Sequence, residues 1–227
     1  MRPHLFNRLS LCAAAIGALA ASAFVIAPSI AAEDAVVIPA PVMDVAAADG
    51  LQTAVIAGGC FWGVQGVFQH TAGVVNAVSG YAGGNKSTAK YDLVSTGTTG
   101  HAESVEIKYD PKRISYGKIL QIYFSVAHDP TQLNMQGPDH GRQYRSAIFY
   151  MNDQQRTLAE GFIKSINDSK ALSQAVVTEV VPFKGFYKAE PEHQDFVQFN
   201  SDNDYVVYND LPKLKELKKK FPELYKN

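Results

Sequence analysis

The chain has 227 residues, 46% of them hydrophobic, and a formal net charge of −1 at pH 7. This nearly neutral balance excludes the strongly basic surface that nucleic-acid-binding proteins use, so we expect no nucleic-acid partner. The length and the hydrophobic content are sufficient for one domain with a full core.

Residues 1–31 have the pattern of an export signal. Arg2 and Arg8 precede a long apolar stretch, and Ser29 and Ala31 supply small side chains where signal peptidase reads them. We expect cleavage after Ala31 and export, with the periplasm as the location. Because the apolar stretch approaches the roughly 20 residues of a membrane span, an uncleaved membrane anchor is the alternative.

Residues 32–50 are rich in alanine, valine and proline and have neither helical nor alternating periodicity. This composition predicts a flexible tether. The folded domain would then extend over residues 51–227.

Strand-like and helix-like patterns alternate along this domain. We expect strands at 54–57, 74–81, 103–109, 145–151 and 176–181. We expect helices at 61–70, 115–127, 153–167, briefly from Pro191, and at 211–224. The mixed order predicts an α+β fold, a two-layer sandwich with a mixed sheet and helices packed on it. The order of the strands does not follow from these patterns.

Cys60 follows Gly58 and Gly59, between the first expected strand and the first expected helix. The glycines permit a sharp turn that places Cys60 at the helix N-terminus. The unpaired N–H groups and the helix dipole favour an anion there, so we expect the pKa of the thiol to fall below its free value of about 8.5. The other cysteine, Cys12, lies in the export signal. A lone thiol in an oxidising compartment favours a reactive role over a structural one.

Glu103 falls on the apolar face of its expected strand, together with Val105 and Ile107. Burial disfavours the charged carboxylate and raises its pKa, which suits a general acid near neutral pH. The alternative is a carboxylate at the strand end that faces solvent or pairs with Arg145.

The loop at 136–141 is dense in turn-forming residues and contains Asp139 and His140. Functional groups concentrate on such loops, although Asp139 is equally suited to capping a turn through the backbone. Phe61 and Trp62, directly after the cysteine, indicate an apolar wall for a small hydrophobic group. Candidate phenol donors to a cleft are Tyr81, Tyr91 and Tyr144.

The histidines lack the spacing of metal ligands on one helical face, and the chain has no CxxC pair, so we expect no metal site. A cysteine hydrolase is a rival interpretation, in which His101 or His140 would serve as the base for Cys60.

Five short motifs occur in order within residues 52–200. They are Gly-Cys-Phe-Trp-Gly at 59–63, Gly-Tyr-Ala-Gly-Gly at 80–84, Thr-Gly-His-Ala-Glu at 99–103, Val-Ala-His-Asp-Pro at 126–130 and Asp-His-Gly-Arg-Gln-Tyr-Arg-Ser at 139–146. Together they closely resemble the A-type peptide methionine sulfoxide reductases. The resemblance implies a two-layer α+β fold and the reduction of methionine-S-sulfoxide, free or in proteins, to methionine.

The resemblance also implies a role for most of the residues named above. Cys60 resembles the nucleophile that becomes a sulfenic acid, Glu103 the proton donor, Tyr91 and Tyr144 the phenol donors, Asp139 a further polar contact, and Phe61 and Trp62 the pocket for the substrate methyl group.

Many relatives carry recycling cysteines near the C-terminus, and some carry one at the position of Ser95. Residues 200–208 contain none, so the chain resembles the variant with a single catalytic cysteine. The resemblance then implies no bound cofactor and an external thiol reductant that is thioredoxin-like, glutaredoxin-like or a small thiol. A non-catalytic module that binds methionine is the remaining alternative.

Overall fold

The computed structural model describes residues 36–45 and 49–227. Six strands form the main sheet: β1 (Gln52–Ala57), β2 (Val74–Ala82), β3 (Ala102–Tyr109), β6 (Ala147–Tyr150), β7 (Glu179–Pro182) and β8 (Phe186–Lys188). Their order is β7-β6-β1-β3-β2-β8, and only β6 and β7 run parallel. The expected mixed sheet is confirmed. A separate ribbon pairs β4 (Met135–Gln136) with β5 (Asp139–His140).

The helices are α1 (Phe61–Gln69), α2 (Tyr91–Val94), α3 (Tyr116–Ile122), α4 (Asp153–Ser169), α5 (Phe196–Phe199) and α6 (Leu211–Lys220). One π-helical turn, Tyr123–Ala127, extends α3, and another, Val206–Asp210, leads into α6. Ser115 caps α3 and Asn152 caps α4, each through its side chain. The periodic patterns therefore located the long elements, whereas α2, α5, β8 and the β4–β5 ribbon were not expected. The short helix expected from Pro191 is a 3₁₀ turn, Pro191–His193.

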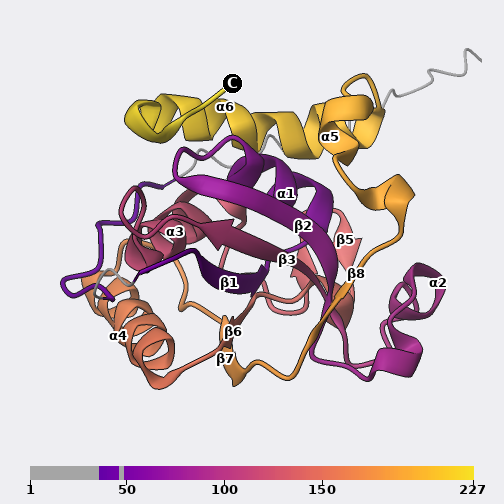
Figure 1. Ribbon diagram of the computed structural model, residues 1–227, viewed down its shortest axis with the longest axis horizontal. Coiled ribbons are helices and arrows are strands. Elements are labelled where there is room, and N and C mark those ends of the chain that lie inside the picture. Colours follow the sequence, from indigo (N-terminus) through magenta and orange to yellow (C-terminus); the bar gives the residue numbers. More distant parts are fainter. Residues whose placement is uncertain (1–35, 46–48) are drawn as a thin grey trace, which may run out of the picture. The chain divides into compact units, whose positions relative to one another are not determined.

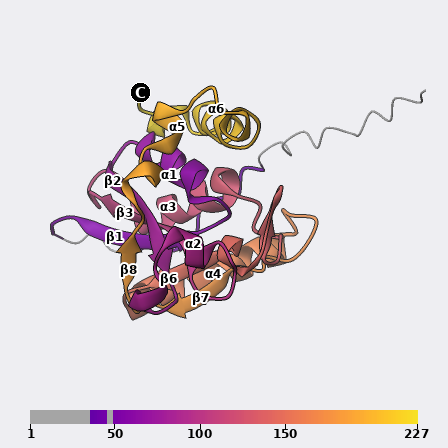
Figure 2. The same cartoon turned by 90° about the vertical axis from the view of Figure 1, so that its right-hand side faces the viewer.

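Helix α1 packs directly on β2 and β3, and α5 and α6 pack on α1 (Figures 1 and 2). The main core lies between the sheet and the helices. It contains Ile56 of β1, Val105 and Ile107 of β3, and Val64 and Phe68 of α1. This arrangement is the expected two-layer α+β sandwich, with the C-terminal helices as an outer cover over α1.

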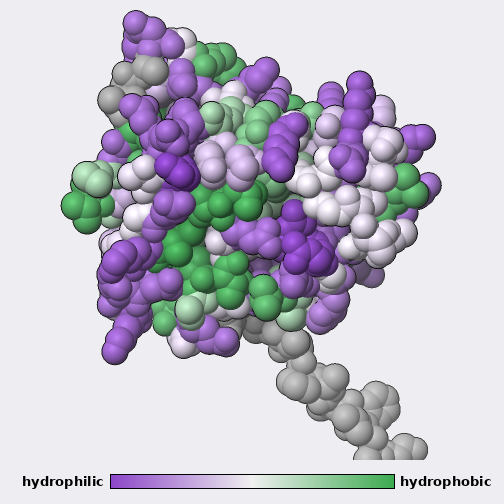
Figure 3. Space-filling model, turned by 90° about the horizontal axis from the view of Figure 1, so that it is seen from below, coloured by the Kyte–Doolittle hydropathy of each residue, from purple (hydrophilic) through white to green (hydrophobic). Residues whose placement is uncertain are grey.

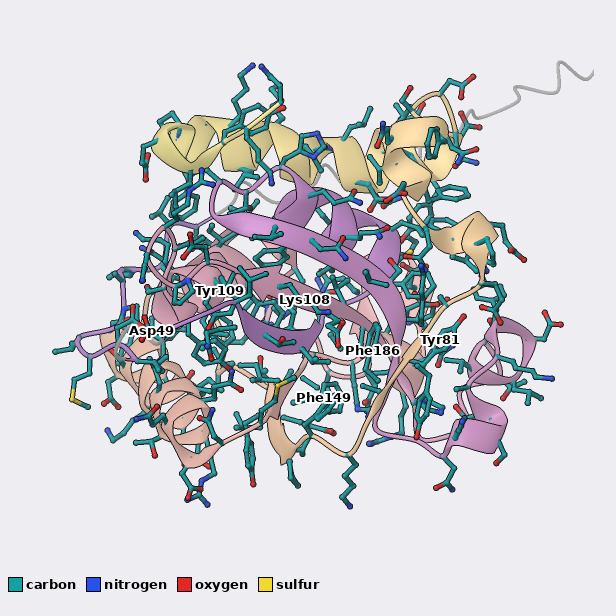
Figure 4. All side chains as sticks on the ribbon, viewed as in Figure 1. Asp49, Tyr81, Lys108, Tyr109, Phe149 and Phe186 are labelled. Carbon is teal, nitrogen blue, oxygen red and sulfur yellow. The ribbon has the colours of Figure 1, made fainter. Side chains whose placement is uncertain are left out.

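The other face of the sheet is also buried at its centre, which the alternating pattern of β3 did not predict. Ala102 and Ser104 point to this face and are both inaccessible to solvent. A second apolar cluster includes Val55 and Phe149, and Phe186 packs against it. Figure 4 places Phe149 and Phe186 on the side of the strands away from α1, and Figure 3 shows apolar side chains gathered on the underside of the molecule.

The expected flexible tether at 32–50 does not hold for residues 36–45, which pack on the domain. Ile38 is fully buried; its N–H donates to Ser125 Oγ at 2.9 Å, and its carbonyl accepts from Gln121 Nε2 at 2.7 Å. Asp44 accepts from Gly117 N at 2.8 Å and covers the start of α3. One buried isoleucine and these polar contacts hold a segment that has no periodicity of its own.

The expected export signal, residues 1–31, lies outside the described residues. Within residues 36–45 and 49–227, none of the helices has the length and the apolar character needed to cross a membrane.

Candidate active site

A tight turn presents Cys60 at the first turn of α1, as expected. Gly59 has φ +82°, a backbone conformation that residues with a Cβ rarely adopt. A Cβ at this position would also overlap the side chain of Gln136. The Gly59 N–H donates to the Tyr144 carbonyl at 3.2 Å. Cys60 is the N-cap residue of α1, with 7% of its surface exposed. The turn therefore holds the sulfur at a helix N-terminus without opening it to bulk water.

The expected lowering of the Cys60 pKa is wrong. Burial raises the pKa of the thiol well above its ordinary value, and the charges of Glu103 and Asp210 raise it further. The Trp62 N–H at the helix N-terminus opposes this rise but does not overcome it. Desolvation outweighs the hydrogen bond from the helix N-terminus here, so Cys60 is a thiol rather than a thiolate at neutral pH.

Glu103 of β3 lies beside this thiol. It is buried, and its Oε2 accepts a hydrogen bond from the Phe61 N–H at 3.1 Å. Burial raises the pKa of its carboxyl group to about 8, although the Phe61 N–H lowers it. Glu103 is therefore mostly protonated at neutral pH and able to donate a proton. Arg145, the alternative partner, pairs with Glu179 at 3.1 Å instead.

A cavity of about 180 Å³ opens onto both groups. Its lining comprises Cys60, Phe61, Trp62, Tyr91, Glu103, Asp139, Tyr144 and Tyr205. The seven residues to which the family resemblance gave a role all lie in this lining. Tyr205 is the additional member.

The polar groups of the cavity differ in how they are held. Burial raises the pKa of Tyr91 and of Tyr144, so both phenols stay protonated and available as hydrogen-bond donors. Asp139 accepts a hydrogen bond from the Tyr205 hydroxyl. Burial raises the pKa of Asp139, while this hydrogen bond and Lys213 lower it.

Stacked aromatic rings support Trp62 and Tyr91, two of the lining residues. The Trp62 indole stacks on Phe196 with ring centroids 3.7 Å apart and planes 9° apart. Tyr205 meets the edge of Trp62, with centroids 5.8 Å apart. His193 lies 4.1 Å from the Tyr91 ring and 6.0 Å from the Trp62 ring, again between centroids. The Trp62 ring therefore gives the cavity an aromatic wall, the apolar side that a thioether methyl group requires.

Glu190 fixes the position of Tyr91. One carboxylate oxygen accepts from the Tyr91 N–H at 3.0 Å, and the other accepts from the Tyr81 hydroxyl at 2.8 Å. Tyr81, an early candidate for the cleft, is therefore occupied inside the sheet and does not line the cavity. Sequence reasoning missed Glu190, His193, Phe196 and Tyr205, since they lie on short turns without periodicity; Pro191 was the only signal nearby.

A buried polar network of Tyr123, His128 and Ser146 holds the end of β1, just before the turn at residues 58–60. The Tyr123 hydroxyl donates to the Ala57 carbonyl at 2.7 Å and lies 2.8 Å from Ser146 Oγ. His128 Nε2 lies 2.7 Å from the same Oγ, and its ring packs against Gly58. Burial lowers the pKa of His128 to about 4, so this histidine is neutral at pH 7 and holds the end of β1 in place.

The histidine base of a cysteine hydrolase is not found in the cavity. The ring of His101 interacts with the Gly84 N–H at 3.2 Å and with the Asn85 carbonyl at 2.9 Å, while His140 is exposed on β5. Neither lines the cavity with Cys60. Residues 36–45 and 49–227 contain no group of three or more potential metal-binding side chains.

A buried cysteine beside a protonated carboxyl, faced by two phenols and an aromatic wall, defines an enzyme site with a thiol nucleophile and a proton donor. The model of the peptide methionine sulfoxide reductase family matches residues 52–225. The chain belongs to this family.

Two relatives cover most of the chain. A peptide methionine sulfoxide reductase MsrA 2 of Mesorhizobium japonicum is 58% identical over 183 residues, which are 81% of this chain and 94% of that protein. Another of the same name, from Synechocystis, is 47% identical over 213 residues, 92% of this chain and 97% of that protein.

Solved structures agree with this assignment. Mxr1 of Saccharomyces cerevisiae in reduced form is 30% identical, with a TM-score of 0.62, and the match covers 67% of this chain and 87% of that one. Methionine sulfoxide reductase A of Corynebacterium diphtheriae is 34% identical, with a TM-score of 0.58, over 68% of this chain and 77% of that one.

Proposed function

We propose that this protein reduces methionine-S-sulfoxide, free or in proteins, to methionine through a sulfenic acid on Cys60. The Cys60 sulfur attacks the sulfoxide sulfur and loses its proton, and the sulfur–oxygen bond breaks as Glu103 protonates the departing oxygen. A water molecule then attacks the Cys60 sulfur and breaks the transient sulfur–sulfur bond, which releases the thioether and leaves a sulfenic acid on Cys60. The balance is one thiol and one sulfoxide in, one sulfenic acid and one thioether out. The carrying observation is that Cys60 and the protonated Glu103 line the same small cavity.

Each remaining wall of the cavity suits one part of the substrate. Glu103 would supply a proton to the sulfoxide oxygen as negative charge develops on it, and Tyr91 and Tyr144, which line the same cavity, would donate hydrogen bonds to that oxygen. Phe61 and Trp62 would take the methyl group. Because the polar and apolar walls distinguish oxygen from methyl, one sulfoxide epimer is favoured.

Turnover of free methionine sulfoxide with dithiothreitol tests this function against a module that only binds methionine. We expect catalytic turnover of the S epimer and little of the R epimer, measured by chiral separation of the remaining substrate. Binding without turnover would overturn the proposal, and equal loss of both epimers would overturn the stereochemical assignment.

We further propose that an external thiol, thioredoxin-like, glutaredoxin-like or small, recycles the enzyme. Cys60 is the one cysteine in the described residues, so no second thiol stands near it there to form an internal disulfide. A reduced Cys12→Ser protein given excess sulfoxide and no reductant should form about one methionine per chain and stop. Mass spectrometry should then find one added oxygen on Cys60, and two methionines per chain would contradict this scheme.

Export to the periplasm is also proposed, on the charge and hydropathy pattern of residues 1–31 alone. The intact mass of protein from the periplasmic fraction should correspond to a chain that begins at Ala32. A full-length mass in the membrane fraction would instead support the anchor.

A further inference from the structure

Helix α2 carries Tyr91 but has little packing of its own. It spans Tyr91–Val94 at the edge of the molecule (Figure 1), and Val94 is its one buried residue. Its N-cap residue, Lys90, makes no side-chain cap hydrogen bond within the part of the chain that the structure describes. A helix this short is not stable by itself, so contacts from other segments must hold Tyr91 at the cavity.

Glu190 binds the start of α2. Its Oε1 accepts a hydrogen bond at 3.0 Å from the Tyr91 N–H, one of the N–H groups that a helix leaves unpaired at its start. Its Oε2 accepts from the Tyr81 hydroxyl at 2.8 Å, and Tyr81 is the residue of β2 that pairs with Glu103 of β3. The carboxylate therefore ties the start of α2 to the sheet at the position of the proposed proton donor.

The Glu190 carboxylate is ionised at neutral pH. Burial raises the pKa of this group, but hydrogen bonds, the first of them from the Tyr91 N–H, lower it more, so the pKa lies below its ordinary value. A charged acceptor makes stronger hydrogen bonds than a neutral one. The turn Pro191–His193 directly follows and places the His193 ring 4.1 Å from the Tyr91 ring, between centroids. One short segment therefore contacts both the backbone and the ring of Tyr91.

Gln143 binds the other end of α2. Its Nε2 donates at 3.1 Å to the carbonyl of Ser95, the C-cap residue of this helix. A Cβ at Gly97 would lie 2.9 Å from Gln143 Oε1, so the same side chain lies against the turn that follows α2. Gln143 is buried and directly precedes Tyr144, the other phenol that the proposed reaction uses. Both ends of α2 are thus bound by long polar side chains from remote segments.

We propose that Glu190 and Gln143 are positioning residues that clamp α2 and hold the Tyr91 phenol in the cavity. This inference rests on the proposed function, in which that phenol donates a hydrogen bond to the sulfoxide oxygen. Glu190 and Gln143 lie outside the cavity lining, so each acts through Tyr91. A hydrogen-bond donor contributes fully to catalysis only when its position is fixed before the transition state forms.

Amide hydrogen exchange across residues 91–95 tests the clamp without reference to activity. Glu190→Leu and Gln143→Leu each remove the polar contact at one end of α2 and should accelerate this exchange roughly tenfold, because the helix opens more readily. Glu192→Leu, an exposed neighbour of Glu190, is the matched control and should exchange like the parent. Gln143→Leu leaves Tyr81 paired, so it keeps the test decisive if Glu190→Leu does not fold. Exchange equal to that of the parent in the folded clamp variants overturns the proposal.

A double-mutant cycle with Tyr91→Phe tests the effect on the reaction. In single turnovers, each clamp variant should form methionine roughly tenfold more slowly than the parent, since a misplacement of about 1 Å can cost up to 10²-fold. The Tyr91→Phe background lacks the hydroxyl to be positioned, so the same substitutions should have little further effect there. An equal slowing in both backgrounds indicates a general structural role and overturns the proposal. If the parent reduces no sulfoxide, the proposed function fails, and the exchange measurement alone decides whether the clamp exists.

Discussion

The two sides of the cavity are built in different ways. On one side, Cys60 and Glu103 come from the turn before α1 and from β3, at the centre of the sheet, and both are buried. On the other side, Tyr205 lines the cavity, and His193 and Phe196 stack on the Tyr91 and Trp62 rings behind it. These residues belong to residues 193–205, the wrapped segment, which packs on α1 and is held by ring stacking and a few hydrogen bonds.

This difference separates the proposed reacting groups, Cys60 and Glu103, from the residues that surround them. A nucleophile and an acid must hold their distance and their protonation states, which the buried sheet and the turn enforce. The wrapped segment contributes apolar surface and polar groups to the surroundings of the cavity. Substitutions in it can change these properties without displacing the proposed reacting groups. Substitutions on the sheet side should therefore remove the reaction, whereas those on the wrapped side should alter its rate or the substrate affinity.

Cys60→Ser should give the largest effect and abolish turnover, because a serine hydroxyl is hardly ionised near neutral pH and is a poor nucleophile. The assay is methionine formation from methionine-S-sulfoxide with dithiothreitol, and Cys12→Ser is the control expected to retain activity. Substantial turnover by Cys60→Ser would show that Cys60 is not the nucleophile.

Glu103→Gln should slow a single turnover by roughly 10²–10⁴-fold, since the amide keeps the shape but has no carboxyl proton to deliver. Glu106→Gln, on the same strand but outside the cavity, is the control and should react like the wild type. If the single-turnover rate of Glu103→Gln equals that of the wild type, the proton must come from another group, with Tyr91 and Tyr144 as the next candidates.

The pH dependence of the wild type should report the same carboxyl group. Because the pKa of Glu103 is about 8 and the acid form is the active one, single-turnover rates should fall as pH rises through about 8. Its folded pKa is raised, so the associated stability is complete below the unfolded pKa and is lost as pH rises toward 8. Glu103→Gln should accordingly lose this decline in stability between the unfolded pKa and about pH 8; a decline that persists in thermal melts would implicate another group.

Tyr205→Phe should slow turnover by about tenfold, because it leaves Asp139 without its buried hydroxyl donor. Tyr208→Phe is the control within the following turn, where the ring is 73% exposed. Equal rates for the two variants would show that the wrapped segment does not act on the polar side of the cavity.

Phe196→Ala should give the smallest effect, a rise in KM of a few-fold with kcat largely retained, because the Trp62 ring loses a stacking partner worth about 1 kcal/mol. The control is Phe199→Ala in the same helix, whose side chain is 73% exposed. A large loss of kcat in Phe196→Ala would mean that this wall also positions the reacting atoms.

Local patterns were sufficient for the sheet side of the site. Two glycines between a strand-like and a helix-like run placed Cys60 at the helix N-terminus, and strand alternation placed Glu103 in the core. Both inferences rest on backbone geometry, which neighbouring residues specify. The ordered motifs added Tyr91, Tyr144 and Asp139, which the cavity brings together.

Local patterns failed where the outcome depended on packing. The segment around Ile38 looked like a tether because one buried side chain leaves no periodic trace. The helix dipole predicted a lowered Cys60 pKa, but the extent of burial, which only the packed structure reveals, reversed the sign.

The sequence by itself determined the fold class and the family, and it singled out Cys60 and Glu103, because these follow from residue types at short, ordered spacings. The tertiary structure decided the strand order, the stacking of Phe196 and Tyr205 with Trp62, and the burial of Cys60. Desolvation and charge act through space, and the residues that exert them on Cys60 are up to 150 positions away along the chain.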